Sequence, residues 1–139
     1  MDNGFIPKHG GYKNLVVYRI AEVIYDFTFR FCNKYVKNQG RTYDQMVQAA
    51  RSGMQNIAEG SVDSGVSKAS ELKLTGIAKG SLQELREDYS SYMRQRGLSE
   101  AQARRLQIEG FVGDVVTRCG IEPLCGAVME LASAKMEKL

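Results

Sequence analysis

Few side chains in this chain of 139 residues have the types and spacing that acid-base, nucleophilic or metal chemistry requires. His9 is the single histidine, and a lone histidine in a glycine-rich stretch is far more often solvated than bound to a metal. A di-metal carboxylate bundle needs Glu-x-x-His pairs, which one histidine cannot supply. Serine and cysteine nucleophiles also lack a histidine base. We therefore expect no catalytic residue, no metal site and no cofactor.

The three cysteines, Cys32, Cys119 and Cys125, are odd in number and lie within apolar helical patterns. Cys119 and Cys125 have no partner pair with the spacing of a zinc site. We interpret all three as reduced core thiols, which are typical of a cytoplasmic protein.

Glu71 and two glycines are the remaining candidates for chemistry. Glu71 projects onto the apolar face of its predicted helix. It is either a buried acid with a catalytic task or a carboxylate that accepts hydrogen bonds from a neighbouring helix end, and we favour the second. Gly76 and Gly80, in GIAKG, indicate a close approach of backbones. A phosphate loop needs a strand before its glycines and a Lys-Ser or Lys-Thr pair after them. Neither is present here, which excludes that kind of nucleotide site.

The composition, with 43% hydrophobic and 25% charged residues, is typical of a soluble globular chain long enough for one core. No apolar run approaches the roughly 20 residues of a membrane helix, and residues 1–12 lack the features of a signal peptide. We expect a cytoplasmic protein with no membrane partner. Residues 1–70 carry nine Lys and Arg against six Asp and Glu, whereas residues 71–139 carry ten of each. The net charge of +3 permits an anionic partner.

Apolar periodicity predicts a first helix from Asn14 to Lys37, after a flexible N-terminal arm of residues 1–12. Two apolar stripes lie side by side on this helix. The first stripe consists of Val17, Ile20, Ala21, Ile24, Phe27, Phe31 and Tyr35, and the second consists of Tyr18, Tyr25, Phe29, Cys32 and Val36. Together they cover roughly 240°, about twice the arc that a surface helix of a monomer buries. A central position within its own fold would explain this arc, but we favour packing of the second stripe against another subunit.

Capping residues and periodicity predict the remaining elements. A second helix over Tyr43–Glu59 is capped by Thr42 and ended by Gly60, and a third helix is capped by Ser67 and extends to about Arg96. A further helical segment runs from the capping box of Ser99 and Gln102 to Cys119, and a last segment begins at Pro123. The expected fold is all-α, an antiparallel up-and-down four-helix bundle. It forms one domain over residues 13–139, and its last helix is either one long helix or two shorter ones.

Four phrases of the sequence resemble a known family. They are GYKNLVVYRIAEVIYDFTFRFC, RTYDQMVQAARSGMQNIAEG, SGVSKASELKLTGIAKGSLQELREDY and MRQRGL, which together cover about residues 11–98. The chain resembles the four-helix-bundle proteins encoded in intervening sequences of bacterial 23S ribosomal RNA genes, a group that includes the accessory variability determinant of diversity-generating retroelements. The resemblance implies a homopentamer around a central channel and a non-enzymatic role. In the retroelement branch it implies nucleic acid and a reverse transcriptase as partners.

These observations leave two readings of function. The first is a homo-oligomeric adaptor, a pentamer by the resemblance, that binds RNA or DNA phosphates through basic residues of the first two helices: Arg19, Arg30, Lys34, Lys37, Arg41 and Arg51. Arg51 alternatively serves as a structural pairing residue. The second is a protein-only scaffold for an unknown partner. In both readings the second stripe is the subunit interface, and Asn56, Glu59, Gly60 and Glu71 form a structural polar motif where the second helix ends and the third begins.

Overall fold

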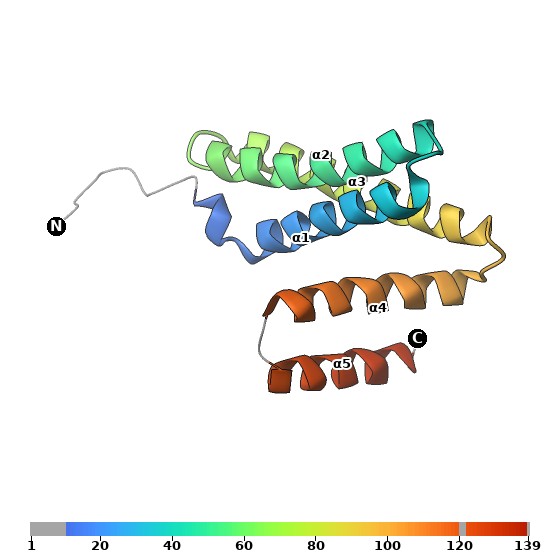
Figure 1. Ribbon diagram of the computed structural model, residues 1–139. Coiled ribbons are helices and arrows are strands. Elements are labelled where there is room, and N and C mark those ends of the chain that lie inside the picture. Colours follow the sequence, from blue (N-terminus) through green and yellow to red (C-terminus); the bar gives the residue numbers. More distant parts are fainter. Residues whose placement is uncertain (1–10, 120–121, 139) are drawn as a thin grey trace. The chain divides into compact units, whose positions relative to one another are not determined.

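The computed structural model describes residues 11–119 and 122–138, and these residues form helices without a strand (Figure 1). The α-helices are α1 (Val16–Phe31), α2 (Arg41–Asp63), α3 (Lys68–Arg94), α4 (Glu100–Cys119) and α5 (Glu122–Met136). A short 3₁₀ helix, η1 (Tyr12–Asn14), precedes α1, and a π-helical turn, η2 (Cys32–Val36), follows it. The all-α prediction is confirmed, and the segment after residue 99 forms two helices rather than one.

The chain divides into two compact units, Met1–Arg86 and Glu87–Leu139. Unit 1 contains η1, α1, η2, α2 and most of α3, whereas unit 2 contains the last turns of α3 together with α4 and α5. Within unit 2, α4 packs against α5. The single four-helix bundle over residues 13–139 stays a prediction, and most of the predicted arm, residues 1–10, lies outside the described residues.

The core of unit 1 forms where α1, α2 and α3 each contribute a small or branched residue. Ala21 of α1, Ile57 of α2 and Ala78 of α3 form one buried cluster, and Tyr18 and Met54 pack against it. Because two of the three central side chains are methyl groups, the three helix backbones approach closely, and the larger side chains fill the flanks of the contact.

The contact between α2 and α3 is especially close at Gly53. A Cβ atom at this position would lie 2.6 Å from Cδ2 and 2.7 Å from Cγ of Leu82. Beside it, the hydroxyl groups of Ser52 and Ser81 form a hydrogen bond of 2.9 Å across the same pair of helices. Gly53 therefore serves packing, since Leu82 occupies the space that a larger residue would need.

The first helix begins and ends differently from the prediction. Asn14 belongs to η1, and Leu15, in an extended conformation, is the N-cap residue of α1. The helix then passes at Cys32 into a π turn, in which i→i+5 hydrogen bonds place more residues in each turn. Side chains after Phe31 consequently point in directions that a constant 100° per residue does not predict.

The second helix is longer than predicted at both ends. Its N-cap residue is Gly40, with φ of 38° and no side-chain cap, so the predicted cap Thr42 lies inside the helix. The predicted end, Gly60, is a buried interior residue whose added Cβ would lie 3.4 Å from Cβ of Leu74. Gly60 thus brings α2 close to the start of α3, and α2 continues to Asp63 because this packing outweighs the low helix propensity of glycine.

The predicted caps of the later helices are confirmed. The backbone N–H of Ser70 donates to Oγ of Ser67 (3.2 Å) at the start of α3. Ser99 and Gln102 form a reciprocal capping box at α4, with distances of 2.9 Å from the Ser99 N–H to the Gln102 side chain and 3.2 Å for the return bond. The predicted terminator Gly120 lies outside the described residues.

The close contact at Gly53 leads to a stability prediction. Gly53→Ala should lower the free energy of unfolding by about 1 kcal/mol, because overpacking against Leu82 costs about 1–3 kcal/mol and the gain in helix propensity is about 1 kcal/mol. In a Leu82→Ala background the same substitution should raise it. Urea denaturation of the four variants measures the coupling.

Gly76→Ala is the matched control, because nothing lies within 4 Å of a Cβ at Gly76 and the residue is exposed. This substitution should stabilise the protein by up to about 1 kcal/mol. A Gly53→Ala variant that is as stable as the Gly76→Ala variant would contradict the packing argument.

Candidate functional site

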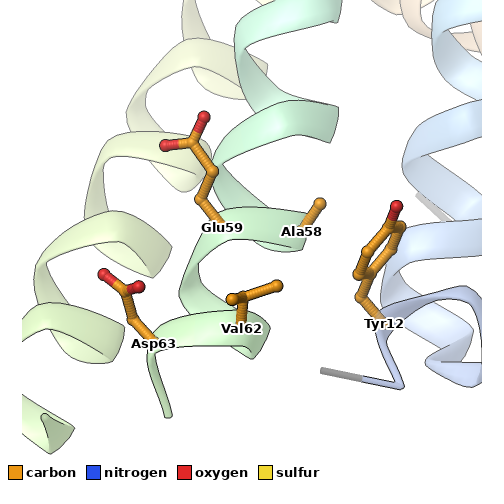
Figure 2. Close-up of a pocket in the computed structure, with 5 residues that line it drawn as sticks. All are labelled: Tyr12, Ala58, Glu59, Val62 and Asp63. Atoms are coloured by element: carbon orange, nitrogen blue, oxygen red, sulfur yellow. The ribbon is translucent and has the colours of Figure 1, made fainter. Parts of the chain in front are cut away.

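An open pocket of about 470 Å³ lies beside η1, lined by Tyr12, Ala58, Glu59, Val62 and Asp63. In the view of Figure 2, Ala58 and Val62 of α2 lie between the Tyr12 ring and the carboxylates of Glu59 and Asp63. The lining contains no nucleophile with a base beside it. It offers two carboxylates one helical turn apart and an aromatic ring.

Within the described residues, the predicted polar motif of Asn56, Glu59, Gly60 and Glu71 does not form one hydrogen-bonded group. Nδ2 of Asn56 donates to the carbonyl oxygen of Ser52 (2.8 Å) and lies 3.2 Å from Oγ of Ser52. Glu59 lines the pocket, and Gly60 packs against α3. These residues therefore have separate structural roles along α2.

For Glu71, the sequence favoured a structural role over a catalytic one. Nζ of Lys68 donates to its carboxylate at 2.6 Å, and the Glu71 side chain is 31% exposed. Its position in the first turn of α3 also stabilises the helix through the helix dipole. The partner is thus a lysine of the same turn rather than a neighbouring helix end, and the carboxylate is not fully buried.

The structure divides each apolar stripe of α1 between covered and exposed residues. Cys32 and Val36 of the second stripe are 0% exposed, because η2 packs against α2, and Sγ of Cys32 lies 4.0 Å from Sδ of Met46. The assignment of Cys32 and Val36 to a subunit interface is wrong, because the chain itself covers them.

Tyr18 is another member of the second stripe. Burial raises the pKa of its phenol above the ordinary value, and the nearby Glu22 and Tyr12 add to the rise.

Phe29 and Tyr25 complete the second stripe. Their rings stack on one another with centroids 6.4 Å apart, and Phe29 is 44% exposed while Tyr25 is half-buried. Of the five residues that were predicted at the interface, Phe29 has the most exposed side chain.

The stripe that was predicted to face inward is instead the more exposed one. Its exposed members, with the neighbouring Val16, are Val16 at 72%, Val17 at 53%, Ile20 at 46% and Tyr35 at 53%. Ala21 of this stripe belongs to the core, and Ile24, Phe27 and Phe31 are half-buried. Periodicity thus identified two apolar stripes, but it did not reveal which one α2 covers, because both are equally apolar.

All six basic residues that were predicted to contact nucleic acid are exposed: Arg19, Arg30, Lys34, Lys37, Arg41 and Arg51. Lys34, Lys37 and Arg41 follow one another across the turn from η2 to α2, and Nζ of Lys34 lies 5.2 Å above the Tyr35 ring. Nε of Arg30 donates to the carbonyl oxygen of Asp26.

Arg51 points to solvent from the middle of α2. Among the described residues, no carboxylate lies within 4.0 Å of it, so the alternative of a structural pairing residue has no support there. The six residues therefore make a dispersed basic surface rather than one pocket.

Over residues 11–119 and 122–138, no group of three or more His, Cys, Asp or Glu side chains is arranged to bind a metal ion. No helix within the same ranges has both the length and the apolarity that crossing a bilayer demands. His9 lies outside the described residues.

Comparisons of this chain with protein families, with curated proteins and with solved structures find no match. Any function assigned to the chain therefore depends on its own residues.

The burial of Cys32 leads to a labelling prediction. In a Cys119→Ser/Cys125→Ser background, Cys32 should react with a thiol reagent at least roughly 100-fold more slowly in the native protein than in urea, because reaction requires η2 to open. The rate should not depend on protein concentration, since α2 of the same chain provides the cover. Ellman's reagent measures both quantities.

The control is a cysteine placed on the exposed face of α2 by Gln48→Cys in a cysteine-free background, which should react rapidly. If Cys32 becomes reactive when the protein is diluted, a partner chain covers it and Cys32 belongs to a subunit interface after all.

Proposed function

We propose that this protein is a non-enzymatic homo-oligomeric adaptor that associates with RNA or DNA. A pentamer is the assembly favoured by the family resemblance. One observation carries the proposal: α1 packs against α2, yet it keeps the large apolar side chains of Val16, Val17 and Ile20 exposed.

The exposed stripe supports self-association on energetic grounds. Burial of an exposed aliphatic side chain contributes about 1.5–3 kcal/mol, and exposed apolar patches mark sites of association. Val16, Val17 and Ile20 lie within five residues of one helix, so a second copy of the same stripe would cover them together. Phe29 at 44% and Tyr35 at 53% exposure extend the apolar surface toward η2.

The basic residues support an anionic partner. Lys34, Lys37 and Arg41 are exposed at the end of α1 and the start of α2, and symmetry would repeat them once per subunit. A pentamer would carry a net charge of roughly +15, which is sufficient for salt-sensitive binding to phosphates.

The assembly is tested by sedimentation equilibrium. Wild-type protein should sediment as an oligomer, whereas Val17→Glu/Ile20→Glu should weaken association at least about tenfold, because two carboxylates would be buried without partners. Gln48→Glu is the control, since it adds a charge to the exposed face of α2. Circular dichroism establishes that each variant is folded. A wild-type monomer of 15.5 kDa would contradict the proposal.

Binding of nucleic acid is tested by gel retardation with an RNA hairpin and a DNA duplex. Protein purified without nuclease should retard at least one probe at micromolar concentration and low salt, and the affinity should fall steeply as salt is raised. Lys34→Gln/Lys37→Gln/Arg41→Gln should weaken the binding. If neither probe is retarded, nucleic acid is not the partner.

A protein-only scaffold is the second candidate, and the polar surface of α2 favours it. Gln45, Gln48 and Gln55 are exposed, and amide side chains suit a hydrogen-bonded contact with another helix. This candidate predicts a specific protein that co-purifies after nuclease treatment and high salt. Loss of that protein when nuclease is added would count against it.

A further inference from the structure

A second basic surface lies at the turn from α3 to α4, within unit 2. Residues 94–105 contain four arginines and one glutamate, and no lysine. This local excess of positive charge occurs in a half of the chain whose basic and acidic residues are equal in number. It therefore disappears when charge is summed over the half-chain.

The turn that carries these arginines has a defined backbone. Gly97, with φ of 83°, ends α3; its N–H donates to the carbonyl oxygen of Arg94 (2.9 Å), and the N–H of Leu98 donates to that of Met93 (3.2 Å). These two bonds are the Schellman pattern of a helix C-terminus. The capping box of Ser99 and Gln102 begins α4 immediately afterwards, so the turn holds its shape through local hydrogen bonds.

A hydrogen bond between the helices brings the arginines to one level. Nε2 of Gln107 donates to Oγ of Ser90 at 3.3 Å, which sets residue 107 opposite residue 90. For antiparallel helices joined by this turn, Arg94 then lies opposite residue 103, close to Arg104. At 1.5 Å per residue, Arg94, Arg96 and Arg104 fall within roughly 5 Å along the helix axis.

Of the four arginines, Arg105 is paired with a carboxylate, which distinguishes it from the other three. Nε of Arg105 donates to Glu109 at 2.8 Å, which raises the pKa of the guanidinium, and the charge of Glu137 adds to this effect. Arg94, Arg96 and Arg104 are exposed. No carboxylate of the described residues lies within 4.0 Å of these three side chains.

Arg96 is held in a fixed orientation. Its guanidinium carbon lies 3.4 Å from the centroid of the buried Tyr92 ring, and one terminal nitrogen donates to the Tyr92 carbonyl oxygen (3.1 Å). A guanidinium has five N–H groups in one plane, so further donors remain at its edge. The stacking reduces the side-chain entropy that Arg96 would lose on binding a ligand.

We infer that Arg94, Arg96 and Arg104, which we call the corner patch, bind the phosphodiester backbone of a nucleic acid. Guanidinium groups match phosphate oxygens in bidentate geometry, and a cluster of arginine without lysine favours this recognition. Phosphates of one duplex strand recur every 3.4 Å along the axis, so arginines at one level of the helix pair suit contacts with neighbouring phosphates. The inference rests on the proposed association with nucleic acid, but it assigns the contact to another surface.

The test uses the full-length chain and whichever probe, RNA hairpin or DNA duplex, the wild-type protein retards. Arg94→Gln/Arg104→Gln should weaken binding and lower the magnitude of the slope of log K against log salt by about 1.4–1.8, since each lost phosphate contact removes about 0.7–0.9. Arg94→Lys/Arg104→Lys should keep most of the slope but bind more weakly than wild type, because lysine cannot bind phosphate in bidentate geometry.

Lys73→Gln/Lys79→Gln is the matched control, because it removes the same charge from exposed positions of α3 in unit 1. Its slope should stay within about 0.5 of wild type. If the wild-type protein binds the probe and the Arg94→Gln/Arg104→Gln slope equals that of the control, the corner patch is wrong and the proposed function stands. If the wild-type protein retards no probe, both are wrong.

Vesicles with phosphatidylserine provide the last arm of the test. If binding to these vesicles depends on Arg94 and Arg104 while binding to the nucleic acid does not, the patch recognises a lipid surface and the inference is overturned.

Discussion

The close approach of three helix backbones in unit 1 is the constraint on which the rest of that unit depends. Ala21, Ile57 and Ala78 meet at its centre. The absence of a side chain at Gly53 lets Leu82 of α3 pack directly against the backbone of α2. Small residues at a helix contact give no hydrophobic area comparable with that of leucine, but they allow dense packing of backbones and of the neighbouring side chains. Ala21 of α1 therefore turns inward, while Val17 and Ile20 of the same stripe stay exposed.

The rotation of α1 changes what the apolar surface means for function. The π turn directs Cys32 toward α2, where Met46 covers it. The cysteine therefore belongs to the interior of the chain itself. Val16, Val17 and Ile20 are left exposed on the same helix. The excess of apolar area that suggested self-association is thus retained, but most of it lies on the first stripe, with Phe29 of the second. Packing within the chain decides which residues are left for an interface.

Charge shows a similar difference between composition and arrangement. The sum over residues 71–139 is zero, yet Arg94, Arg96 and Arg104 are exposed near the turn from α3 to α4, with no carboxylate of the described residues within 4.0 Å. Acidic residues of the same half occur elsewhere, and two of them act on Arg105. A phosphate responds to charges within about a Debye length, so the local arrangement decides recognition and the total does not.

The sequence by itself determined the helices, because periodicity, caps and glycines act over a few residues: the all-α class, the cap at Ser67 and the capping box of Ser99 and Gln102 follow from local rules. Tertiary packing decided the rest. Gly60 lies inside α2 because contact with Leu74 compensates for its low propensity, and the π turn redirects Cys32 and Val36 toward α2. It also decided which stripe of α1 is covered, because two stripes of similar hydrophobicity differ only in how well their shapes fit a neighbouring helix.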